Sequence, residues 1–218
     1  MKKLIPILLL ICICLTGCSL KKEYELCGME QVEALRAEAQ GWVSARYLLT
    51  NLETGETDQV FSFMNNADGT QTYLYEKIVD GSYYAEYSGD GVFCVMDGTD
   101  VSYFKEGAEG YAAYTTENPH PYSTGELLFY VNLYVQSSAE NTDGQGNVTY
   151  TYTYDTAKIN ESLGTSLTSF VTAYSFDKDG NFLYFTQSNS DGENEYAYMI
   201  ETWDINSITE IENPALEQ

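Results

Sequence analysis

The chain has 218 residues, with 10 Lys and Arg against 33 Asp and Glu, which gives a formal net charge of −23 at pH 7. A chain this acidic has no basic surface to neutralise phosphates, so nucleic acid is excluded as a partner. Only 20% of the residues are charged, whereas 44% are hydrophobic and 20 residues are Tyr, so the composition is that of a packed domain rather than a disordered acidic tail.

The first seventeen residues predict a signal peptide. Lys2 and Lys3 precede an apolar run, 4–15, which has the length of a signal h-region and is too short to span a membrane comfortably. The tetrapeptide Leu15-Thr16-Gly17-Cys18 resembles the bacterial lipobox, which implies cleavage before Cys18 and a diacylglycerol on its thiol. The alternatives are an ordinary signal peptide, or an uncleaved anchor with an incidental Cys. We expect a lipid-anchored protein on the extracytoplasmic face of a cell membrane.

Cleavage changes the expected charge and organisation of the mature chain. Loss of Lys2 and Lys3 takes the 10 basic residues to 8, which against 33 acidic residues gives a net charge of −25. A domain with that charge is repelled by an anionic bilayer. We expect residues 18–27 to form a lipidated tether and residues 28–218 to form a single, monomeric β-rich domain.

Cysteine usage leaves one pair that can form a disulfide. Cys12 and Cys14 leave with the signal and Cys18 is acylated, so that Cys27 and Cys94 remain. An oxidising exterior permits that bond. The alternative, which we favour, is two separate reduced thiols, with Cys94 as a small hydrophobic residue in a strand core.

The mature chain begins with a helix and continues as strands. Residues 29–40 carry apolar side chains at helical spacing among good helix formers, and Gly41 ends the pattern. Asp-Gly dipeptides then recur between runs rich in Tyr, Phe, Val and Thr, which is a strong signal for β-hairpins. The expected strands, joined in order, are 42–52, 57–65, 70–79, 82–88, 92–96 and 100–105.

The middle of the chain departs from this pattern. Residues 107–125 contain Gly, Ala and Pro and are typical of a loop. The apolar spacing of 126–134 is close to that of a helix, which we expect there, although its aromatic and β-branched residues are also compatible with a strand. A strand is expected at 147–155, where Tyr alternates with Thr, so that one face is aromatic and the other hydroxylated. A short helix is expected at 156–163, ended by Gly164.

The last expected strands are 167–177, 182–189 and 195–203, separated by turns that contain Asp-Gly. In the second of them we expect Phe182, Tyr184 and Thr186 to share one face. The sequence therefore predicts an α+β fold, an antiparallel β-meander with an N-terminal helix and a central helical insertion packed on the sheet.

Signals for catalysis are weak, and we expect neither an enzyme nor a cofactor. The single His, His120, lies between two prolines, and neither a nucleophile elbow nor a zinc-protease helix motif is present. Some pair of carboxylates will be close by chance among 33, so acidic residues carry no information on glycosidic chemistry.

A calcium loop beginning at Asp177 is also rejected. An EF-hand requires Gly at its sixth position and Glu at its twelfth, where this chain has Phe182 and Ser188. A hairpin turn explains Asp177-Lys-Asp-Gly-Asn181 better, and no metal is expected.

The Tyr excess is the feature best suited to binding. Tyr combines a large apolar ring with a polar tip, so aromatic residues on a concave sheet suit an acyl chain or a sugar. The alternative is that Tyr serves here only as a strand former. The candidate binding residues are Phe61, Phe63, Tyr73, Tyr75, Tyr83, Tyr87, Tyr150, Tyr152, Tyr154 and Tyr184.

The order of elements resembles the LolA-like superfamily of lipoprotein carriers and its lipid-anchored relatives of the LppX type. The similarity lies in the layout, namely lipobox, tether, helix, long meander, central helical insertion and three final strands, and in the closing stretch 196–214. It implies a strongly curved sheet, a half-barrel, with an apolar cavity that accommodates lipid. Carriers of the LolA type are soluble, whereas this chain is anchored at Cys18, so a fixed binder is the better expectation.

Two functions from different classes follow. The first is non-catalytic binding of a hydrophobic ligand, a lipid or acyl chain, in a half-barrel cavity. The second is a cell-envelope interaction module that recognises a protein or a glycan through a Tyr-rich sheet surface.

Overall fold

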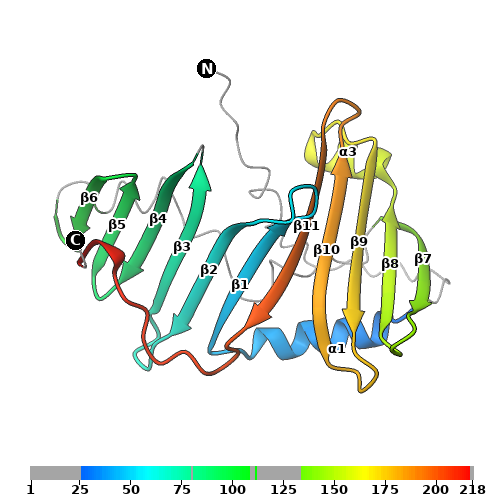
Figure 1. Cartoon of the computed structure of the whole chain (residues 1–218), viewed down its shortest axis with the longest axis horizontal. Helices are drawn as coiled ribbons and strands as arrows, with labels where there is room; N and C mark the ends of the chain where they lie inside the picture. The colour runs from blue at the N-terminus through cyan, green and yellow to red at the C-terminus, as the bar shows by residue number, and fades with distance from the viewer. Residues whose placement is uncertain (1–25, 80, 109–110, 112–133, 217–218) are drawn as a thin grey trace. The chain divides into compact units, whose positions relative to one another are not determined.

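The computed structural model describes residues 26–79, 81–108, 111 and 134–216 (Figure 1). These residues belong to two compact units. One unit contains the N-terminal helix and the chain from Pro121 to Glu195, and the other contains Gly41–His120 and the chain from Tyr196 onward. We call them the α1 unit and the β1 unit and describe each by itself.

The β1 unit is an antiparallel meander that ends on its own first strand. Its strands are β1 (Ser44–Asn51), β2 (Thr57–Asn65), β3 (Gln71–Val79), β4 (Ser82–Gly89), β5 (Val92–Asp97), β6 (Asp100–Lys105) and β11 (Glu195–Trp203). They are ordered β6-β5-β4-β3-β2-β1-β11, as Figure 1 shows. The last strand therefore pairs with the first, with Leu49 opposite Ile200.

The two faces of the β1 unit carry different side chains, because successive residues of a strand point to opposite sides. We call the side that carries Tyr87 the Tyr87 face, and the chain after β11, residues 204–216, the C-terminal segment. On the Tyr87 face, Ile211 and Ala215 of this segment pack on a buried cluster. The members of that cluster are Ala85, Tyr87, Cys94 and Met96. Asn206 fastens the start of this segment, since its backbone N–H donates to the Ser44 carbonyl at 2.8 Å. The other side, the Tyr47 face, carries the candidate site described below.

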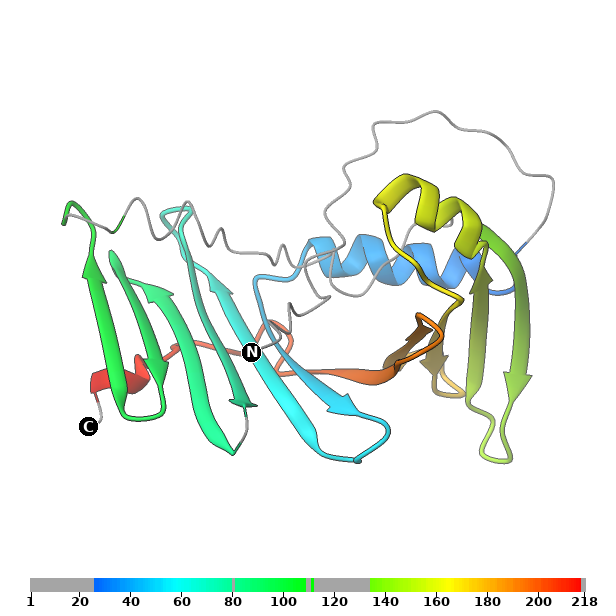
Figure 2. The same ribbon diagram turned by 90° about the horizontal axis from the view of Figure 1, so that it is seen from above.

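The α1 unit contains two helices and four strands. Its elements are α1 (Met29–Gln40), β7 (Val135–Thr142), β8 (Val148–Tyr154), α3 (Thr156–Leu163), β9 (Ser169–Phe176) and β10 (Phe182–Ser190). The strands are ordered β10-β9-β8-β7, and both helices lie on the same side of them (Figure 2). Helix α1 buries Val32, Leu35 and Ala39, which are spaced by three and four residues along one face.

Local capping explains the limits of α3. Asp155 precedes the helix in an extended conformation, and its carboxylate accepts a hydrogen bond from the Lys158 backbone N–H at 3.3 Å. Gly164 ends the helix in the left-handed conformation, with a φ of 66°.

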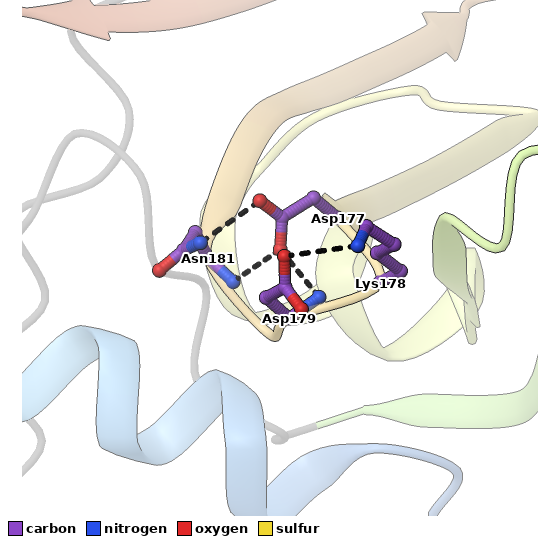
Figure 3. Close-up of polar contacts among 4 residues, drawn as sticks. All are labelled: Asp177, Lys178, Asp179 and Asn181. Atoms are coloured by element: carbon purple, nitrogen blue, oxygen red, sulfur yellow. Dashed lines mark hydrogen bonds and ion pairs between the residues drawn. The ribbon is translucent and has the colours of Figure 1, made fainter.

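The Asp-Gly turns are held by aspartate side chains. In the β9–β10 hairpin, Asp177 Oδ1 accepts from the backbone N–H groups of Asp179 at 2.9 Å and Asn181 at 2.8 Å, and Oδ2 accepts from Asn181 Nδ2 at 2.8 Å (Figure 3). These bonds lower the pKa of Asp177, chiefly through Asn181. Asp143 accepts an equivalent pair from Asn147.

The antiparallel α+β fold is confirmed, and most predicted elements lie within two residues of the observed ones. The helix at 29–40 and the helix at 156–163 have the expected limits. Strand β7 was not predicted, because its sequence is polar and nearly all of it is exposed. Four expected features lie outside the described residues: the lipobox, His120, the central loop except for residues 107, 108 and 111, and the helix at 126–134 except for Tyr134.

The expected common face of Phe182 and Tyr184 is wrong. The register of β10 against β9 shifts between these two residues, so that Phe182 lies opposite Phe176 and Tyr184 lies opposite Ser175. Phe182 therefore shares a face with Phe176, whose ring centroid is 5.9 Å away, and Tyr184 points to the other side.

No helix in the described part of the chain is long and apolar enough to cross a membrane.

Candidate functional site

Four aromatic side chains form a continuous buried row on the Tyr47 face. Tyr47 comes from β1, Phe61 and Phe63 from β2, and Tyr73 from β3. Each is at most 5% exposed. The Tyr47 ring centroid lies 6.1 Å from those of Phe61 and Phe63, and Phe61 lies 6.1 Å from Tyr73. We call these four residues the aromatic row.

Strand register produces the row. Tyr47 lies directly opposite Phe61, and Phe63 lies directly opposite Tyr73. Residues two apart on a strand share a face, so Phe61 and Phe63 lie side by side, with ring centroids 6.3 Å apart. Burial raises the pKa of Tyr47, so its hydroxyl stays neutral across the physiological range. The row is therefore an uncharged aromatic surface.

Trp42 extends the row at the edge where the chain enters β1. Its ring centroid lies 6.5 Å from that of Tyr47, and its side chain is 3% exposed. The indole Nε1 has no hydrogen-bond partner among the described residues.

A polar cluster adjoins the row on the same face. Tyr75, opposite Phe61, donates from its hydroxyl to Gln59 Oε1 at 2.8 Å. The Lys77 ammonium lies 4.6 Å from the Tyr84 ring centroid and 5.6 Å from that of Tyr75. The Tyr84 hydroxyl donates to a carboxylate oxygen of Glu86. The Tyr47 face thus passes from an apolar row to a group of hydrogen-bonding and charged side chains.

The ten candidate binding residues fall on four different surfaces. Phe61, Phe63, Tyr73 and Tyr75 share the Tyr47 face, whereas Tyr83 and Tyr87 lie on the Tyr87 face with the C-terminal segment. In the α1 unit, one face of β8 carries Tyr150, Tyr152 and Tyr154, and the opposite face of the strands carries Tyr184. The structure thus gathers four of the ten on the face that carries the aromatic row.

The three β8 tyrosines have contacts that explain their positions structurally. The Tyr152 hydroxyl donates to the Cys27 carbonyl at 2.7 Å, and a Cβ added to Gly28 would lie 2.3 Å from the Tyr150 ring. The Tyr154 hydroxyl pairs with Thr172 Oγ1 at 3.2 Å, and burial raises its pKa to about 12. Tyr150 and Tyr152 thus contact the two residues that precede α1, and Tyr154 packs within the sheet.

Sequence reasoning missed Trp42, Tyr47 and Lys77. Tyr47 shares one face of β1 with the buried Ala45 and Leu49, which lie two residues before and after it. That spacing of apolar residues was the available signal. Trp42 follows the Gly41 that ends the helical pattern, and nothing in the local sequence marks its indole as unpaired. Lys77 joins the site only through the register of β3 against β4, where it lies opposite Tyr84.

Cys27 and Cys94 are both free thiols in the structure. Cys94 lies in the cluster under the C-terminal segment and is 1% exposed, and burial raises the pKa of its thiol. Within the described residues, no three His, Cys, Asp or Glu side chains are grouped to hold a metal ion.

No protein-family model matches the sequence, and no curated protein matches it. Solved structures that are similar to this chain include two from mycobacteria. The crystal structure of LprF from Mycobacterium bovis is 13% identical over 86% of this chain and 96% of that chain, with a TM-score of 0.49. The crystal structure of the Mycobacterium tuberculosis lipoprotein LppX is 11% identical over 84% of this chain and 96% of that chain, with a TM-score of 0.46.

Proposed function

We propose that this protein is anchored by lipid at Cys18 to the extracytoplasmic face of a membrane and binds a hydrophobic ligand, without chemistry, on the Tyr47 face of the β1 unit. The observation that carries the proposal is the aromatic row. Small-molecule sites are mostly apolar with a few oriented polar groups. The aromatic row, together with the polar cluster that contains Lys77, has that composition.

The exposure of the candidate residues favours ligand binding over recognition through a Tyr-rich surface. All ten candidate binding residues are buried or half-buried. An interaction module that reads a glycan or a protein with these rings needs them at the surface, whereas a site for an acyl chain needs them sheltered from water.

The length of the tether is consistent with an anchored binder. Tyr152 fixes Cys27 to the α1 unit, and the expected tether runs from Cys18 to Cys27. Fully extended, a chain of that length reaches about 30 Å. The folded body therefore stays close to the membrane that supplies a hydrophobic ligand, while its net charge keeps it off an anionic surface.

A matched pair of substitutions tests the site. Phe61→Leu alters the centre of the aromatic row, and Phe185→Leu alters a similarly buried Phe of the α1 unit. Binding of a diacylglycerol that carries a fluorescent pyrene chain is measured for both. We expect about two- to tenfold weaker binding for Phe61→Leu alone, because aromatic contacts contribute this much to affinity. Equal effects of both substitutions, or no saturable binding by the parent protein, would contradict the proposal.

A further inference from the structure

The indole nitrogen of Trp42 is a buried donor that lacks an acceptor among the described residues. The backbone that follows the indole is held by two hydrogen bonds. The Trp42 carbonyl accepts from Asn65 Nδ2 at 3.3 Å, and the N–H of the next residue donates to Asn206 Oδ1 at 2.7 Å. The unpaired group is therefore held in a well-anchored segment, and its position next to the aromatic row is set by the fold.

A donor in this state is unfavourable, and proteins rarely retain one without a reason. Burying an N–H without an acceptor forfeits its hydrogen bond to water, and a buried Trp normally finds a partner for its indole. Phe would supply an aromatic ring at this place without that loss. The presence of the N–H points to an acceptor that a bound molecule brings.

The surroundings restrict the chemistry of that acceptor. The Trp42 ring lies 6.5 Å from Tyr47, and the rings of the row continue from there, so the molecule that reaches Nε1 has an apolar part. A carboxylate needs a cation in a buried site. Arg46, next to Tyr47 in sequence, points to the opposite face, where it pairs with Asp204 at 3.2 Å and donates to Ser62. Lys77 is on the Tyr47 face, but it lies opposite Gln59, which lies opposite Leu49, seven residues along the chain from Trp42. A neutral carbonyl meets the donor without burying a charge.

We propose that Trp42 Nε1 donates a hydrogen bond to an ester carbonyl oxygen of an acyl lipid whose chain lies along the aromatic row. The inference rests on the proposed function and adds the class of ligand. The ligand is an acyl ester, as distinct from a hydrocarbon, an ether lipid or a free fatty acid.

Two lipids that differ only in their carbonyl groups test this inference. Dimyristoylglycerol has two ester carbonyls, and di-O-tetradecylglycerol has the same chains and free hydroxyl with ether links. Each is titrated into the full chain carrying Cys18→Ser, which removes any acyl ester of the protein's own, in dodecyl maltoside micelles. The chain has two Trp residues, so two indole N–H resonances report in a ¹⁵N-labelled sample. Trp203, which is 53% exposed, is the internal control, and Trp203→Phe assigns the pair.

We expect the ester to bind about two- to tenfold more tightly than the ether, which is the range for one neutral hydrogen bond. The Trp42 indole proton should move downfield with the ester alone, and Trp42→Phe should abolish the preference. Equal binding of both lipids without a Trp42 shift, or a preference that persists in Trp42→Phe, overturns the inference and leaves the proposed function standing. Binding of neither lipid overturns both. The resonance shift in the parent protein decides the matter even if Trp42→Phe fails to fold.

Discussion

The Tyr152 hydroxyl donates a hydrogen bond of 2.7 Å to the carbonyl oxygen of Cys27, 125 residues earlier in the chain. Cys27 in turn donates from its backbone N–H to Ser138 Oγ at 3.0 Å. Cys27 is where the expected tether ends and the folded body begins. These two bonds therefore fix the point at which the folded body meets the expected tether.

Removing the Tyr152 hydroxyl should weaken this attachment. We expect Tyr152→Phe to lower the free energy of unfolding by about 1 kcal/mol, the usual contribution of one hydrogen bond. Urea unfolding followed by fluorescence measures the change. Tyr184→Phe is the matched control, since its hydroxyl lies on the opposite side of the strands and has no hydrogen bond in the described part of the chain, and it should change stability by less than about 0.5 kcal/mol. Equal effects of the two substitutions would contradict this role for Tyr152.

Gly28 should be intolerant of a side chain for two separable reasons. Its φ is +63°, which disfavours any L-residue, and an added Cβ would lie 2.3 Å from the Tyr150 ring. Gly164 has a φ of +66° with open space around it, so Gly164→Ala measures the backbone term alone, about 1 kcal/mol. We expect Gly28→Ala to lower the thermal midpoint more than Gly164→Ala does. Similar shifts in the two variants would show that the Tyr150 contact yields without cost.

The Asp177 turn should make part of the stability depend on pH. Hydrogen bonds from Asn181 lower the pKa of Asp177 in the folded protein below the ordinary value of an aspartate. The contribution is therefore present above about pH 4 and is lost as the pH falls through the lowered folded-state pKa. We expect the stability difference between the parent protein and Asp177→Asn to be largest at neutral pH and to shrink below pH 4. Asp179→Asn is the control, because the Asp179 carboxylate lies 3.6 Å from the exposed Lys178 ammonium, whereas the hydrogen bonds of the turn are accepted by Asp177. A pH-independent difference for Asp177→Asn would exclude this linkage.

The two described cysteines should differ in reactivity. Burial both hides the Cys94 thiol and raises its pKa, and these effects slow attack of the Cys94 thiolate on a disulfide reagent, whereas Cys27 is half-buried. In protein freed of its signal, we expect the reagent to label the Cys27 peptide promptly and the Cys94 peptide only on unfolding, as mass spectrometry of the digest will show. Ile211→Ala should speed the labelling of Cys94 by loosening the C-terminal segment. A digest in which neither peptide is labelled until a reductant is added would demonstrate the Cys27–Cys94 disulfide instead.

Local chemistry made much of the fold predictable from the sequence. Asp155 and Gly164 bracket α3 because each residue type suits its end of a helix, and the Asp-Gly turns separate strands whose residues favour extended structure. Strand β7 escaped prediction because its stability comes from pairing with β8 rather than from apolar residues of its own.

The candidate site was predictable only in part, because it depends on pairing between distant strands. Alternation placed Phe61 and Phe63 on one side of their strand, but whether Tyr83 or Tyr73 joins them depends on the register of successive hairpins. A one-residue bulge moved Tyr184 away from Phe182. The unpaired state of the Trp42 indole is a property of the packed structure and has no sequence signature.

Native mass spectrometry of the protein purified from its own membrane in a mild detergent tests the central claim most directly. If the aromatic row binds a hydrophobic ligand, the spectrum will contain a lipid-sized mass in addition to the covalently acylated chain, and this mass will be lost as collision energy rises. A single species with the mass of the acylated chain alone, across gentle conditions, would contradict the claim.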